Sequence, residues 1–153
     1  MMRCRIGFLG VCMVLVTLFF SGCDELGTKP DSVTVNVMTT IYVRLIDAEN
    51  HEVSMNVDSV AVFIEMTKQG NDRLIFNRLT QGSQCQVTAS YLMSEGESIL
   101  VTATIDDSYM GYASIGPATA QLSWATVNSS VNFGAVYHWY PELTVTMKKV
   151  SGA

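Results

Sequence analysis

The chain has 153 residues, of which 48% are hydrophobic and 15% are charged, and its formal net charge is −5. This length allows one domain with a sizeable core. The acidic balance argues against nucleic acid as a partner and against extra attraction to anionic lipid heads.

The first 22 residues have the composition of an export signal. Arg3 and Arg5 precede an apolar run of about 15 residues from Ile6 to Phe20, which is short for a membrane-spanning helix and suits a signal-peptide core. The run leads into residues 20–23 (FSGC), which resemble the lipobox of bacterial lipoproteins, with Phe20 at the position where Leu is usual.

The lipobox resemblance implies that the leader 1–22 is removed and that Cys23 is lipidated as the first residue of the mature chain. Two acyl chains would then hold the protein on a membrane of the bacterial cell envelope, facing the periplasm or the exterior. The leaflet stays open. An uncleaved anchor helix and an ordinary secretory signal are the alternatives.

The cysteines restrict what the mature chain can do. Cys4 and Cys12 lie in the leader and Cys23 would carry lipid, so Cys85 alone remains and no intrachain disulfide is expected. Cys85 occupies an apolar position of a predicted strand, which favours a buried thiol over a nucleophile. Without the leader, seven Lys and Arg face 14 Asp and Glu.

The chain after Cys23 divides into a tether and one domain. Residues 23–32 are polar and include Pro30, which is typical of a linker and would extend about 25 Å from the bilayer. The domain is predicted over 33–150.

Apolar residues alternate with polar ones almost throughout this domain, as in half-buried strands. Strands are predicted, in chain order, over 33–45, 53–57, 60–66, 74–79, 85–91 and 99–105, as an edge strand with a loop within 109–119, and over 122–126, 131–139 and 143–147. Polar or glycine-containing turns separate them, and Pro141 breaks the last apolar face. No segment shows a helical period. The pattern predicts an all-β, two-layer antiparallel β-sandwich.

Four stretches, residues 43–50, 60–66, 74–79 and 98–105, resemble transthyretin-like and carboxypeptidase-regulatory-like sandwiches, which are immunoglobulin-like in layout. Asn50 stands where a turn glycine is usual, and asparagine tolerates positive φ. The resemblance implies an accessory or structural module, and it carries no catalytic residues to transfer.

The aromatic cluster at 137–141 is the best candidate for recognition, because exposed aromatic rings stack on sugars and anchor interfaces. Alternation places Tyr137 and Trp139 inward, in the core. His138 and Tyr140 then point outward and are the predicted ligand or partner contacts.

Chemistry beyond binding has little support in the sequence. No G-x-S-x-G is present, and His51 and His138 are both expected at the surface. Calcium between Asn71-Asp72 and Asp106-Asp107 would require both pairs at one end of the sandwich, and neither has calcium-loop spacing. We therefore expect no catalytic residue, metal or cofactor.

These observations favour a non-catalytic, lipid-anchored envelope protein that contacts another envelope protein through sheet edges or loops. The alternative is a small-ligand or carbohydrate-binding module using Tyr140 or the 106–112 loop. An enzyme is the least favoured class.

Overall fold

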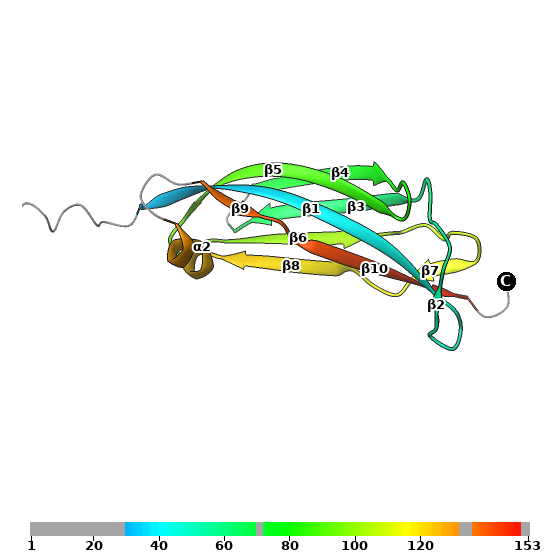
Figure 1. The fold of residues 1–153 in the computed structure, drawn as a ribbon. Coiled ribbons are helices and arrows are strands. Elements are labelled where there is room, and N and C mark those ends of the chain that lie inside the picture. Colours follow the sequence, from blue (N-terminus) through cyan, green and yellow to red (C-terminus); the bar gives the residue numbers. More distant parts are fainter. Residues whose placement is uncertain (1–29, 70–71, 132–135, 151–153) are drawn as a thin grey trace, which may run out of the picture.

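The computed structural model describes residues 30–69, 72–131 and 136–150. In these ranges the chain forms ten strands and one short helix, arranged as two sheets packed face to face (Figure 1). The prediction of an all-β, two-layer sandwich is confirmed. The leader, Cys23 and the tether up to residue 29 lie outside the described residues.

The elements in chain order are β1 (Ser32–Ile46), β2 (Glu52–Val53), β3 (Ala61–Lys68), β4 (Arg73–Leu79), β5 (Gln84–Ser94), β6 (Ser98–Thr104), β7 (Tyr112–Ser114), β8 (Ala118–Ser123), α2 (Trp124–Ser130), β9 (Tyr137–Trp139) and β10 (Glu142–Lys149).

Sheet A is built around β1, the longest strand. On one side, β5 pairs antiparallel with residues 32–42 of β1, and the short β2 pairs with its last two residues. On the other side β9 and then β10 run parallel to β1, and β7 joins the outer side of β10. Figure 1 shows β1 crossing the whole sandwich, so that it begins near α2 and ends near β2 and β7.

Strands β9 and β10 follow one register on β1, although a break separates them. Val37 lies opposite Trp139 and Thr40 lies opposite Glu142, so the same offset continues across the break. Proline has no N–H to donate to a ladder, and Pro141 occupies the gap. Its carbonyl still accepts a bond from the Thr40 N–H at 3.1 Å. The predicted break at Pro141 is therefore local, and this parallel pairing departs from an otherwise antiparallel arrangement.

Sheet B contains four antiparallel strands in the order β4-β3-β6-β8. Its inner face packs on the inner face of sheet A and forms one hydrophobic core. The largest fully buried side chains come from both sheets: Ile41, Leu45, Ile64, Met66, Met93, Ile99 and Met147. The period-two pattern of the sequence thus sorts side chains into core and surface as expected.

Two polar contacts connect the sheets on the side where β5 lies near β3. The buried Tyr91 hydroxyl donates to the Met66 carbonyl at 3.0 Å. The Lys68 ammonium donates to the Leu92 carbonyl at 3.0 Å and lies 3.3 Å from carboxylate oxygens of both Asp72 and Glu97.

One predicted strand is helical over most of its length. The strand expected over 122–126 ends at Ser123, and α2 follows over Trp124–Ser130. Trp124 and Val127, the buried residues of α2, are three positions apart, which matches a helical turn and not the alternation of a strand. The strand expected over 53–57 is also wrong beyond Val53, because residues 54–58 lack strand pairing.

The turn after β1 forms as the resemblance to known sandwiches implied. Asn50 adopts a φ of 70°, the left-handed conformation that a glycine would otherwise supply. Its side-chain oxygen accepts a bond from Lys148 at 2.7 Å, which ties the turn to β10.

Candidate functional site

The outer face of sheet A carries side chains in regular rows across three strands. Asn36 on β1 lies opposite Ser90 on β5 and opposite His138 on β9. Two residues further along β1, Met38 lies opposite Thr88. The shared register of β9 and β10 places Tyr140 on the other side of Met38.

His138 and Tyr140 are both exposed on this face, and Tyr140 keeps 59% of its surface accessible. Their ring planes are within 8° of parallel and their centroids are 6.2 Å apart. This spacing is close to the distance of about 6.7 Å between alternate residues of a strand. The strand itself therefore holds the two rings parallel and on one side.

The neighbours of these rings anchor them. Tyr137 and Trp139 are half-buried and pack against the hydrophobic core. Pro141, directly after Tyr140, is also buried. The alternation of inward and outward side chains predicted for residues 137–140 is thus confirmed.

A groove runs beside the two rings with a volume of about 430 Å³. Its lining comes from β1, β5 and the β9–β10 segment: Asn36, Val37, Met38, Thr88, Ala89, Ser90, His138 and Tyr140. The Ser90 hydroxyl donates to the Asn36 side-chain oxygen at 2.7 Å. We call this the aromatic groove.

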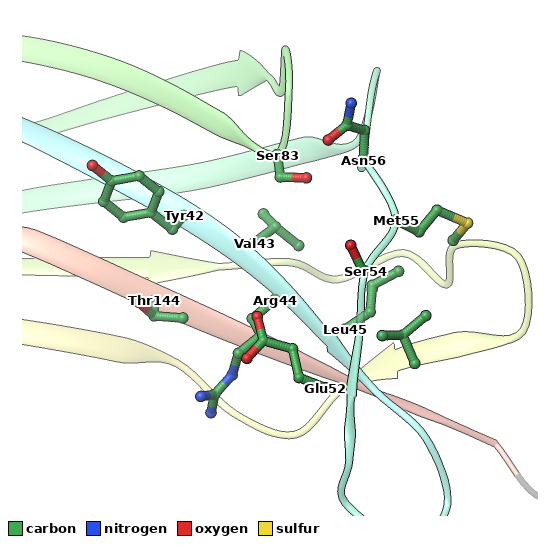
Figure 2. Close-up of a pocket in the computed structure, with 11 residues that line it drawn as sticks. Tyr42, Val43, Arg44, Leu45, Glu52, Ser54, Met55, Asn56, Ser83 and Thr144 are labelled. Atoms are coloured by element: carbon green, nitrogen blue, oxygen red, sulfur yellow. The ribbon is translucent and has the colours of Figure 1, made fainter.

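A second groove, of about 590 Å³, lies further along β1, where β5 begins and β2 ends (Figure 2). Figure 2 shows Tyr42, Arg44 and Thr144 from the sheet together with residues of the irregular segment after β2. The Ser83 hydroxyl accepts the Val57 N–H at 2.7 Å and so fixes that segment to the turn before β5.

Two polar side chains of this second groove, Arg44 and Ser83, are already hydrogen-bonded within the protein. Arg44 donates to the Thr146 hydroxyl at 3.3 Å. Glu52 is the one carboxylate among its described lining residues, so the groove offers no carboxylate pair for acid–base chemistry. We find no arrangement in it that points to a ligand.

The other surface of interest is strand β4, which pairs only with β3 in the described structure. Three of its four apolar side chains remain in solvent, since Leu74, Ile75 and Leu79 are 41%, 62% and 61% exposed, whereas Phe76 packs against the core. Arg73 forms an ion pair with Glu65 of β3 at 2.7 Å. We call this strand the β4 edge.

Two further titratable side chains, His51 and Cys85, bear on the expectations from the sequence. His51 Nδ1 lies 3.2 Å from Asp47 Oδ2 in the turn after β1. The His51 backbone N–H bonds to the same carboxylate, which lowers the pKa of Asp47. Cys85 is a free, buried thiol, and burial raises its pKa. This agrees with the thiol expected from the sequence.

Asp72 and the pair Asp106-Asp107, which were considered for calcium, lie towards opposite ends of β6. Lys68 lies opposite Ile99, so the turn that holds Asp72 is at the beginning of β6. Asp106 and Asp107 follow the other end of β6, after Thr104, because β3 and β6 run antiparallel. Asn71 is outside the described residues. Across 30–69, 72–131 and 136–150, no three His, Cys, Asp or Glu side chains are grouped to hold a metal ion.

Among the residues that the structure covers, no helix has the length and apolarity needed to cross a membrane. Cys23, the predicted lipidation site, lies outside them.

Comparison with known proteins assigns the chain to no family. No protein-family profile matches the chain, and no curated protein sequence matches it either. Among solved structures, a mutant of a pilus-presented adhesin is similar at 13% identity and a TM-score of 0.29. The match covers 80% of this chain, which spans 28% of the length of that adhesin.

Sequence reasoning placed His138 and Tyr140 at the surface, as the structure has them, but it did not identify the β4 edge or the residues beside the two rings. The β4 sequence holds three consecutive apolar residues, Leu74 to Phe76, in place of alternation. This departure from alternation was the signal in the sequence that could have indicated the exposed β4 edge. Asn36, Ser90 and Met38 join the aromatic groove only through strand pairing, which no local pattern encodes.

Proposed function

We propose that this protein is a non-catalytic binding module held at a bacterial cell-envelope membrane by lipid on Cys23, and that the β4 edge is where it contacts a partner protein. The observation that carries the proposal is the combination of unpaired backbone and exposed aliphatic side chains on β4. The anchor rests on the lipobox resemblance of residues 20–23.

The β4 edge has the features of a surface that another strand can extend. A sheet edge presents unpaired N–H and C=O groups, and soluble proteins usually protect such edges with charges, proline or bulges. In β4 three apolar residues and Asn77 separate the two arginines; Arg73 is paired with Glu65, and Arg78 lies over the Phe76 ring. Main-chain pairing would supply affinity, and Ile75 and Leu79 would supply apolar contact on one face.

The anchor and the edge are compatible in geometry. The 15 residues of β1 extend about 50 Å, and β1 begins at the end of the sandwich to which the tether is attached. The β4 edge runs along the side of the sandwich and not across that end (Figure 1). A partner in the same membrane or on its surface could therefore reach β4 without displacing the start of β1, which the tether precedes in the sequence.

The anchor is tested by expressing the full chain and its Cys23→Ser variant in a lipoprotein-producing bacterium with an alkyne-labelled fatty acid. The unsubstituted chain should take up the label and sediment with membranes, because two acyl chains hold a protein on a bilayer. Cys23→Ser should lose the label. Label uptake that survives the substitution would contradict the assignment of Cys23.

The edge is tested by placing a photo-crosslinking residue at Ile75 in the full chain and irradiating intact cells. The matched control places it at Thr119, which is exposed on β8, the opposite edge strand of sheet B. We expect a defined crosslinked band from Ile75 and none from Thr119, and an added Leu79→Lys substitution should reduce the band. Equal bands from both positions, or none from Ile75, would refute the β4 edge as the contact.

A further inference from the structure

We infer that the aromatic groove on the outer face of sheet A is a binding site for a neutral saccharide. This site is separate from the β4 edge, because it lies on the other sheet and shares no residue with that strand.

The two rings leave apolar surface free for a third partner. At a centroid spacing of 6.2 Å they are beyond the contact distance of about 3.5–4.0 Å between stacked carbon atoms, so neither ring covers the face of the other. Tyr140 is 59% exposed. A sugar ring presents flat C–H surface to such an aromatic face and keeps its hydroxyls at its rim, which suits an amphipathic aromatic site.

Hydrogen-bonding side chains lie beside the two rings, where the hydroxyls of a bound sugar would be. Asn36 is opposite His138 in the β-sheet register, and Ser90 is opposite Asn36. The bond from Ser90 uses the oxygen of the Asn36 amide and leaves its NH₂ group to donate. The Thr88 hydroxyl in the next row adds a group that both donates and accepts.

The charge of the groove selects a neutral ligand. None of its eight lining residues is Asp, Glu, Lys or Arg. A phosphate, a sulfated sugar or a charged peptide would meet no lysine, arginine or carboxylate there, whereas amide, hydroxyl and aromatic groups match a neutral polar ring. A volume of about 430 Å³ is near the lower end of the range for ligand sites, about 300–1,000 Å³, so it suits a short part of a glycan.

The test is a glycan array probed with the full-length protein, labelled and kept in a zwitterionic detergent without a sugar headgroup. Neutral and anionic oligosaccharides are printed together, and affinities of hits are measured by calorimetry. We expect binding to a set of neutral glycans. Tyr140→Ala should weaken it about three- to tenfold, as loss of one aromatic stack does, and Tyr140→Phe should retain it.

Tyr42→Ala is the matched control, because Tyr42 is an exposed tyrosine of the same sheet face that lines the second groove and not this one. It should bind as tightly as the unsubstituted protein. The inference is overturned if no neutral glycan binds, if only anionic glycans or peptides bind, or if Tyr42→Ala and Tyr140→Ala weaken binding equally. Circular dichroism of each variant confirms that folding is unchanged.

Discussion

The two sheets follow the same alternation, yet they present different outer faces. On sheet A two pairs of outward polar side chains are joined across the strands by hydrogen bonds, Ser90 with Asn36 and Gln86 with Thr40, and exposed Met38 and Leu92 lie on the same face. On sheet B the outward side chains include the exposed aliphatic residues Ile75, Leu79 and Leu100.

The difference follows from where each strand sits. β1 is paired on both sides, so its backbone is satisfied and only its side chains are available for recognition. β4 is paired on one side and still has backbone groups to offer. One sandwich thus carries a side-chain surface suited to a small polar ligand and an edge suited to another strand.

The largest expected effect concerns what the sheets share, which is the core. Ile41 of sheet A and Ile64 of sheet B are both 0% exposed. Replacing either with alanine should lower the free energy of unfolding by about 2–5 kcal/mol, because a buried cavity replaces the lost side chain. Urea unfolding, followed by far- and near-ultraviolet circular dichroism, measures the loss.

Both variants should unfold in one transition, with the two probes coincident, because one continuous core joins the sheets. Separate transitions, or a large loss for one variant alone, would show that the two sheets are independent units. The comparison would then be between two domains and not between two faces of one.

Strand existence could be predicted from the sequence because burial on one face imposes a period of two. The run from Val33 to Leu45 shows this clearly, and it forms β1 with those residues inside. The outward positions of His138 and Tyr140 were predictable for the same reason. The alternation failed at Trp124. Leu122 and Trp124 fit a period of two, whereas Trp124 and Val127 fit a helical turn, and so short a window does not separate the two periods.

The composition of the aromatic groove was beyond sequence reasoning. Asn36 and His138 are 102 residues apart in the chain, and they meet through a parallel pairing that depends on the whole topology. The solvent exposure of β4 could not be predicted from the sequence for a related reason. Being an edge is a property of strand order, and Leu74 to Phe76 would read identically in a buried central strand.

A smaller effect is expected at the contact that connects the two sheets. Tyr91 of β5 is 5% exposed, and its hydroxyl donates to the Met66 carbonyl of β3. Tyr91→Phe should lower the free energy of unfolding by about 1–3 kcal/mol, because a buried acceptor loses its partner. Denaturant unfolding of both proteins at neutral pH gives the value; an unchanged midpoint would mean that this bond does not hold the sheets together.

The same side chain predicts a dependence on alkaline pH. Burial, with a further contribution from the Asp72 carboxylate, raises the pKa of Tyr91 to about 12, against 10 in the unfolded chain. Between these values the unfolded chain loses its phenol proton and the folded chain keeps it, so the contribution of Tyr91 is complete below pH 10 and declines as the pH rises towards 12. The stability difference between the unsubstituted protein and Tyr91→Phe should shrink over that interval. A difference that stays constant would contradict the raised pKa.

The smallest effect sharpens the contrast between the two outer faces. Ser90→Ala removes the bond to Asn36 on sheet A, and an exposed hydrogen bond contributes about 0.5 kcal/mol, near the lower end of the usual range. Asn77→Ala on β4 is the matched substitution, because Asn77 is also exposed on a strand and makes no side-chain bond with any described residue. Precise thermal unfolding of both variants should show a small loss for Ser90→Ala and none for Asn77→Ala. Equal losses would mean that the cross-strand hydrogen bonds of sheet A contribute nothing to the free energy of unfolding. The two outer faces would then differ in the chemistry of their side chains but not in the stability that those side chains provide.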